Sequence, residues 1–182
     1  MRLFIASDLH GSVAQAARLK EEIEKTGPEA VIFLGDLLYH GPRNPFPEKY
    51  APPEAANILG GFNCPVLAVR GNCDSEVDQL LLKFHLAENA WLLAGTKKPI
   101  LALHGHQLPE NGGHFTAPQD TIILFGHTHR PAAEKRGSNH YWNPGSAALP
   151  KEGLPASYGF YENGCFEVRS FEGLVLAADE CK

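Results

Sequence analysis

Carboxylate, amide and imidazole side chains directly follow five apolar segments in the first two thirds of this sequence. They are Asp8 and His10, Asp36, Asn72, His104 and His106, and His127 and His129. Side chains two positions apart in an extended segment lie on the same side of the chain, so Asp8 with His10, and likewise His127 with His129, can bind one ion. One such residue alone is an ordinary helix cap or core histidine. Five in succession indicate a common site.

The residue types indicate a metal site for hard to borderline divalent ions. Carboxylates, imidazoles and one amide suit Mn²⁺, Fe²⁺, Zn²⁺ or Ni²⁺, and no thiolate is required. The candidate ligands are too many for one ion, so two ions sharing a carboxylate is the economical arrangement. Two such ions about 3.5–4 Å apart can clamp a phosphoryl group and generate a bridging hydroxide. Two divalent cations together with two aspartates keep a net positive charge, and this charge suits the binding of a phosphate ester.

The segments that position these residues are rich in β-branched and aromatic residues, as are strands buried on both faces. We predict strands over 2–7, 30–35, 65–70, 99–105 and 121–127. Helices are predicted over 12–27, 52–61 and 75–84. After residue 131, short strands joined by hairpins are expected, with a turn at 162–164. The pattern indicates one α/β domain over residues 1–182, with ligands bound at the carboxyl ends of the strands.

Composition narrows the function classes. The chain has 182 residues, 43% of them hydrophobic, and a formal net charge of −5. This balance disfavours a basic nucleic-acid-binding face, and we expect no stable nucleic-acid complex. No apolar run is long enough for a membrane span or a signal peptide. The four cysteines form no CxxC pair. We therefore expect reduced thiols, a cytoplasmic protein and no membrane partner.

The motifs SDLHG, GDLLYHGPRN, GNCD, LHGH, FGHTHRP and NPGS, in this order, resemble those of the calcineurin-like metallophosphoesterase superfamily. Within it, they are similar to the small bacterial phosphodiesterases of the YfcE type. The resemblance implies a four-layer αββα sandwich of two central mixed β-sheets flanked by helices. It also implies two metal positions that share Asp36. Their ligands would be Asp8, His10, Asp36 and His129 at one position, and Asp36, Asn72, His104 and His127 at the other.

The leading hypothesis is a phosphodiesterase that uses a hydroxide bridging two divalent ions, with Mn²⁺ as the expected metal. Asn72 and His104 are candidate catalytic residues as well as ligands. A phosphomonoesterase of the same fold is the main alternative. A non-catalytic scaffold, as in the retromer subunit of this fold, is disfavoured because all seven ligand positions are intact. A nuclease acting on long DNA is disfavoured by the acidic balance and the lack of a capping domain.

Cys73 departs from the superfamily pattern, in which GNH precedes an acidic residue. The resemblance implies that this histidine binds a phosphate oxygen and helps to protonate the leaving group. A thiol is smaller and uncharged when protonated, so we expect Cys73 to contact substrate and to bias the enzyme toward diesters. Two other readings stay open. Cys73 is either a small residue that fills a gap or, less simply, a nucleophile.

The segment 39–53 contains five prolines and is too long for a simple connection. His40, Arg43 and Asn44 are candidates for binding substrate, because arginine offers a fork of donors matched to phosphate. The same rigid loop could form a subunit contact, and the resemblance predicts a homo-oligomer, either a dimer or a tetramer. His106 could either support a metal ligand or serve a purely structural role, and both roles are equally open.

Overall fold

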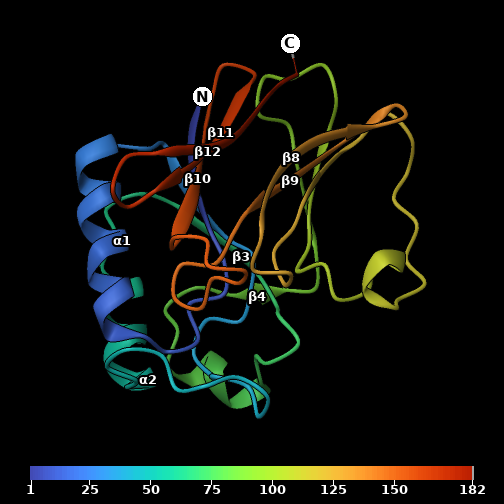
Figure 1. The fold of residues 1–182 in the computed structure, drawn as a ribbon. Helices are drawn as coiled ribbons and strands as arrows, with labels where there is room; N and C mark the ends of the chain where they lie inside the picture. The colour runs from blue at the N-terminus through green and yellow to red at the C-terminus, as the bar shows by residue number, and fades with distance from the viewer. Residues whose placement is uncertain (182) are drawn as a thin grey trace.

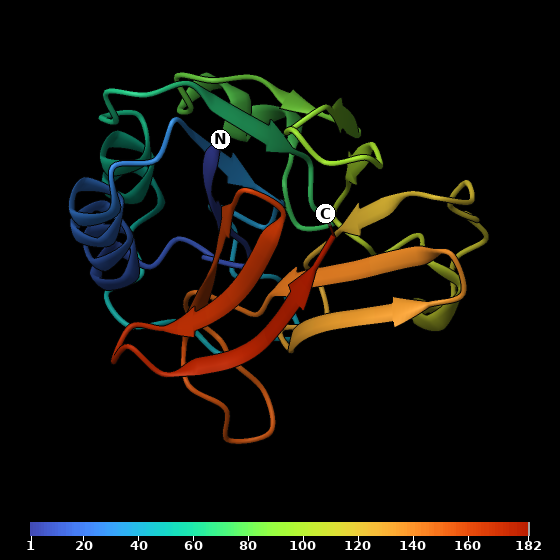
Figure 2. The same ribbon diagram turned by 90° about the horizontal axis from the view of Figure 1, so that it is seen from above.

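Two β-sheets pack face to face at the centre of the computed structural model, which describes residues 1–181 (Figures 1 and 2). The larger has seven strands in the spatial order β12 (Val175–Glu180), β11 (Cys165–Ser170), β10 (Ser157–Glu162), β1 (Arg2–Ala6), β2 (Ala30–Phe33), β3 (Val66–Val69) and β4 (Leu86–Ala87). The smaller has the order β5 (Ala90–Leu92), β6 (Ile100–Ala102), β7 (Ile122–Leu124), β9 (Asn139–Pro144) and β8 (Pro131–Arg136). Both sheets combine parallel and antiparallel pairs, as predicted.

Strand β1 shows how an apolar segment serves two layers of the fold. Its side chains alternate between the faces of the sheet because a strand has a period of two residues. Leu3 and Ile5 point into the core between the two sheets, whereas Phe4 and Ala6 point into the core beneath the helices. Burial on both faces explains why the segment lacks polar residues until it leaves the sheet at Ser7.

The helices α1 (Val13–Thr26) and α2 (Pro52–Leu59) cover the outer face of the larger sheet (Figure 1). The hydroxyl of Ser12 accepts a hydrogen bond from the Gln15 amide at the start of α1, and Gly27 ends the helix with a φ of 55°. Both ends are thus capped, and the helix predicted over 12–27 is confirmed. No helix within residues 1–181 is long and apolar enough to cross a membrane.

The fourth layer lies on the outer face of the smaller sheet and is formed by the segment 104–120. This segment contains one short 3₁₀ helix, η2 (Pro109–Asn111), and its Phe115 packs on Leu101 and Ile123 of the sheet. Pro109 and the following glycines favour turns over a longer helix. The sandwich architecture is therefore confirmed, although this outer layer is mostly loop.

The helix predicted over 75–84 is wrong. Only the 3₁₀ helix η1 (Glu76–Leu80) forms there, and Val77 and Leu80 are 66% and 84% exposed. Because none of the residues of η1 is buried, they cannot stabilise a full helix against the sheet. The short strands β4 and β5 that follow were not predicted. The later hairpins were, and the turn at 162–164 is confirmed with positive φ at Asn163 and Gly164.

A partly buried polar network links the two sheets. One carboxylate oxygen of Asp179 on β12 accepts hydrogen bonds from the indole of Trp142, at 2.8 Å, and from Nδ1 of His140, at 2.5 Å, both on β9. Burial alone raises the pKa of Asp179, but the hydrogen bonds from Trp142 and His140 outweigh it and lower the pKa. The charged carboxylate therefore stabilises the native packing of the sheets.

We expect Asp179→Ala to lower the free energy of unfolding by about 1–3 kcal/mol, because it leaves the buried indole of Trp142 without an acceptor. Asp179→Asn, the matched control, keeps an acceptor oxygen and should lose less. Since the folded pKa lies below the unfolded value, the carboxylate's contribution is present above the unfolded pKa and is lost as pH falls through the folded one. Urea unfolding at neutral pH and below pH 4 tests this. Equal losses at both pH values would contradict the assignment.

Candidate metal centre

The carboxyl ends of five strands meet at one edge of the sandwich. Asp8 and His10 follow β1, Asp36 follows β2 and Asn72 follows β3, whereas His104, His127 and His129 follow β6 and β7 of the other sheet. Backbone hydrogen bonds tie these ends together, from Asp8 N to Gly35 O at 3.1 Å and from Gly126 N to His104 O at 2.9 Å. The structure thus brings all seven predicted ligands to one place.

Five of these seven residues adopt a left-handed backbone conformation that non-glycine residues rarely occupy. They are Asp8, His10, Asp36, His127 and His129, with φ between 52° and 66°. Such strain persists only where the surrounding structure enforces it, and it concentrates at functional sites. Glycines allow the backbone of neighbouring loops to approach these residues closely. A Cβ on Gly71 would lie 2.1 Å from Asp36 Oδ1, and one on Gly126 would lie 1.9 Å from the Ser7 hydroxyl.

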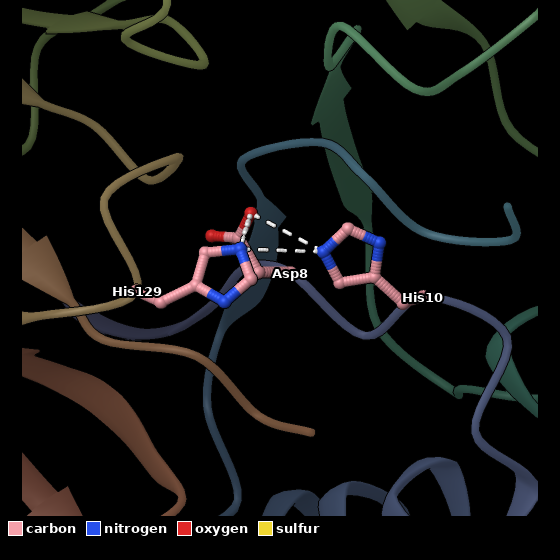
Figure 3. A group of neighbouring side chains, drawn as sticks. All are labelled: Asp8, His10 and His129. Atoms are coloured by element: carbon pink, nitrogen blue, oxygen red, sulfur yellow. Dashed lines mark hydrogen bonds and ion pairs between the residues drawn. The ribbon is translucent and has the colours of Figure 1, made fainter. Parts of the chain in front are cut away.

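Asp8, His10 and His129 converge on a small volume (Figure 3). Oδ2 of Asp8 accepts a hydrogen bond from the His127 amide at 3.0 Å, whereas the buried Oδ1 has no hydrogen-bond partner of suitable geometry among residues 1–181. That oxygen lies 3.3 Å from Nε2 of His129 and 3.8 Å from Nε2 of His10. The two Nε2 atoms are themselves 3.3 Å apart.

The histidine tautomers follow from their backbone contacts. Nδ1 lies near a carbonyl oxygen in His10 (Tyr39 O, 2.8 Å), in His104 (Leu34 O, 2.6 Å) and in His129 (Leu149 O, 2.5 Å). A carbonyl only accepts, so each Nδ1 carries a hydrogen and each Nε2 faces the carboxylates. Nε2 atoms and carboxylates this close together favour a cation between them, which a bound metal ion or a proton on Nε2 supplies.

Asp36 faces a second group of donors as well as the first. Its Oδ1 accepts a hydrogen bond from the Cys73 amide at 2.8 Å. Its Oδ2 lies 3.8 Å from Nε2 of His10 and 3.5 Å from Nε2 of His104. His104 Nε2 in turn lies 3.1 Å from Oδ1 of Asn72 and 3.3 Å from Nδ1 of His127. One carboxylate oxygen therefore stands between two sets of nitrogen and oxygen donors.

These separations fit divalent metal ions. Ligand atoms bound about 2.0–2.2 Å from one ion lie roughly 3.0–3.6 Å from each other. The closest donor pairs here are separated by 3.1–3.5 Å. The unpartnered Asp8 oxygen and the converging Nε2 atoms give the same indication, so the residues present fit the metal-binding role expected of them.

Charges in the centre also favour a bound cation. Burial by itself raises the pKa of Asp36, but the hydrogen bond and charge of His104 outweigh it and hold the pKa below its ordinary value. Conversely, burial lowers the pKa of His104, whereas the contact with Asp36 raises it to about 9. Burial and the nearby His104 lower the pKa of His127 to about 4, which keeps its imidazole neutral near pH 7.

Asp74 positions the centre, although no role was predicted for this residue. Its carboxylate accepts three backbone hydrogen bonds of 2.8 Å, from the amides of Asp36, Leu37 and Gly71. It therefore fixes the loop after β2 against the loop after β3. The acidic residue in GNCD was the available signal. In the NPGS motif, the Ser146 hydroxyl donates a hydrogen bond to Asp8 O at 2.8 Å and so ties this motif to the loop after β1.

An open cavity of about 660 Å³ leads to the centre, and Asp36, Asn72, His127 and His129 lie in its wall. Of the predicted substrate-binding residues, Arg43, Asn44 and Cys73 line it. Tyr39 and Lys151 also line it, and neither was predicted. Burial, helped by the charge of Asp36, raises the pKa of the Cys73 thiol to about 12, so the protein's own groups keep this thiol uncharged at neutral pH.

Two other histidines lie beside the cavity rather than in its wall. His40 packs against the rings of Tyr39, Phe46 and Tyr50, within the Pro-rich loop, and does not line the cavity. The ring of His106 lies 5.6 Å from that of His104, and its buried Nδ1 has no hydrogen-bond partner within residues 1–181. The role of His106 stays open.

Residues 1–163 match the model of the calcineurin-like phosphoesterase superfamily domain. The chain belongs to this superfamily and is a hydrolase that acts on phosphoric ester bonds. It is 44% identical to phosphodiesterase YfcE of Escherichia coli K12 over 169 residues, which cover 92% of this chain and 91% of that protein. A solved structure described as YfcE, a phosphoesterase from E. coli, aligns over 100% of both chains with a TM-score of 0.93 and 40% identity.

More distant structures share the fold alone. An archaeal phosphodiesterase aligns with a TM-score of 0.65 and 19% identity, over 97% of this chain and all of the other. Vacuolar Protein Sorting 29 from Cryptosporidium parvum aligns with a TM-score of 0.66 and 18% identity, over 100% of this chain and 98% of the other. The same backbone therefore occurs in proteins with different names, and the function must be argued from the site.

Proposed function

We propose that this protein is a phosphodiesterase that uses two divalent metal ions, with Mn²⁺ as the expected metal. One observation carries the proposal. Asp36 Oδ2 lies within 3.8 Å of His10 Nε2 and 3.5 Å of His104 Nε2, and thus between two groups of donors at the bottom of an open cavity. The identity to phosphodiesterase YfcE supports the choice of a diester as substrate.

Asp8, His10, Asp36 and His129 would hold one ion, and Asp36, Asn72, His104 and His127 the other. When bound, the ions would supply a hydroxide as nucleophile and positive charge that stabilises the phosphoryl transition state. The protein orients the ligands through its backbone, because the carbonyls of Tyr39, Leu34 and Leu149 hold the three Nδ1 atoms. Fixed ligands need no reorganisation during the reaction.

Around the scissile phosphate, Asn72 and Cys73 present short uncharged side chains. The Asn72 amide lies 3.3 Å from the Cys73 sulfur, and both line the cavity. A phosphodiester has a second substituent that needs room and carries one negative charge fewer than a dianionic monoester. A small neutral group at position 73 suits the diester on both counts. We therefore propose that Cys73 favours diesters and does not act as the nucleophile.

The test is metal stoichiometry combined with hydrolysis of bis(4-nitrophenyl) phosphate. Protein stripped with a chelator should be inactive, and titration with Mn²⁺ should restore activity in step with two bound equivalents per chain. 4-Nitrophenyl phosphate serves as the monoester comparison. A fully active preparation with at most one ion per chain would overturn the two-metal proposal, and preferred hydrolysis of the monoester would favour the phosphomonoesterase alternative. A cytoplasmic location and a homo-oligomeric state stay predictions.

A further inference from the structure

The charges on the cavity wall are not balanced by the protein. Asp36 is the one carboxylate that lines it among the described residues, and two cationic side chains, Arg43 and Lys151, line it as well. Neither Arg43 nor Lys151 forms an ion pair with any residue of the described part of the chain. The neighbouring carboxylate of Glu152 is instead held by Arg130, at 2.5 Å, so it does not neutralise Lys151.

Lys151 is held beside the metal centre by its loop. The carbonyl of Leu149 accepts from His129 Nδ1, and the Leu149 amide donates to the Ser146 hydroxyl at 2.8 Å. The Leu154 amide closes the turn on Lys151 O at 3.1 Å. The backbone of this loop is thereby fixed next to His129, and the exposed Lys151 side chain lines the cavity from it.

Arg43 lines the cavity from the Pro-rich loop, shortly after Gly41, which packs against Cys73. The amide of Asn44 donates to Gly41 O at 3.2 Å, and its side chain donates to His40 O at 2.9 Å, so Arg43 lies within a closed turn. A Cβ on Gly41 would lie 2.8 Å from the Cys73 sulfur, which shows how closely this turn packs against position 73. The two cations therefore line the cavity from two different loops.

A simple phosphodiester carries one negative charge, and that charge belongs at the metal centre. It leaves the two wall cations without a partner, although an open cavity lined by cations attracts further anionic groups. We propose that Lys151, together with Arg43, binds a second anionic group of the substrate. This proposal rests on the function proposed above. The preferred substrates are then phosphodiesters that carry an additional phosphate or carboxylate on one of their two substituents.

Two synthetic diesters that differ only in this group test the proposal. In 4-nitrophenyl propyl phosphate and 4-nitrophenyl 3-phosphonopropyl phosphate, water adds to phosphorus, the bond to the aryl oxygen breaks and 4-nitrophenolate leaves. The phosphonate itself is not cleaved. We expect the phosphono ester to have a kcat/KM about fivefold or more above that of the propyl ester, mainly through a lower KM. A 3-carboxypropyl ester distinguishes a carboxylate from a phosphonate.

Lys151→Gln should remove most of this preference, and Lys151→Arg should retain it. Lys135→Gln is the matched control, since Lys135 is an exposed lysine on β8, outside the cavity. Its preference should equal that of the wild type. If the wild type does not discriminate between the esters, or if Lys151→Gln impairs both equally, the second anion site does not exist as proposed.

A binding measurement without turnover separates this proposal from the proposed function. Calorimetry on the Mn²⁺-loaded protein should show that propane-1,3-bisphosphonate binds about fivefold tighter than propylphosphonate, and that Lys151→Gln loses this difference. Failure of the enzyme to hydrolyse either ester would refute the phosphodiesterase proposal and leave the calorimetric test standing. Equal affinity for the two ligands in the wild type would refute the role of Lys151.

Discussion

An Asp36→Asn variant is expected to lose both metal ions and at least about a hundredfold in diesterase activity. Oδ2 of Asp36 lies between His10 and His104, so one substitution removes negative charge from both groups of donors. A neutral amide is a weaker ligand for hard cations than a carboxylate. Even the loss of a residue that only supports a metal ligand costs about 10–100-fold, so the loss of a shared ligand should cost more.

Asp120→Asn is the matched control for this experiment. Asp120 is exposed and has a φ of 55°, close to the 54° of Asp36, so both substitutions exchange the same groups in the same backbone conformation. Metal analysis of protein dialysed against buffered Mn²⁺, together with hydrolysis of bis(4-nitrophenyl) phosphate, provides the readout. An Asp36→Asn protein that retained two ions and wild-type activity would show that the ligands are assigned wrongly.

Cys73→His is expected to raise the ratio of monoesterase to diesterase activity at least about tenfold. An imidazole has an ordinary pKa near 6.5 and can provide both a positive charge facing a dianionic phosphate and a proton for the leaving group. Because Gly41 packs closely against the Cys73 sulfur, the larger ring must extend into the cavity, toward the substrate. The new ring also occupies space that the two substituents of a diester need, so diesterase activity should fall as well.

Two comparisons identify the cause of such a change. Cys73→Ala should retain most of the diesterase activity, since the metal centre and not the thiol supplies the nucleophile. Cys64→His introduces the same side chain at a half-buried cysteine outside the cavity and should leave the ratio of activities as in the wild type. An unchanged ratio in a folded, fully metallated Cys73→His variant would leave Cys73 as a residue that merely fills space.

Local patterns in the sequence were sufficient to predict which residues gather at the candidate centre. The apolar segments end in Asp8, Asp36, Asn72 and the histidines, and strands buried on both faces admit such residues only where the chain leaves the sheet. The strand ends of an α/β sheet lie at one edge, so the gathering of these side chains could be predicted from local patterns. The same local logic explains why α1, with its Ser12 cap and Gly27 end, was predicted correctly.

Other features depend on contacts between segments that are distant in the sequence, and these features became evident only in the folded structure. Whether the apolar residues of 75–84 form a helix depended on a surface to cover them, and Val77 and Leu80 have none. The carboxylate of Asp74 joins the loops after β2 and β3 through hydrogen bonds to their amides. The contact between His129 and the Leu149 carbonyl fixes the loop from which Lys151 lines the cavity. No local period or spacing encodes these contacts, since the free energy of each depends on chain segments that only folding brings together.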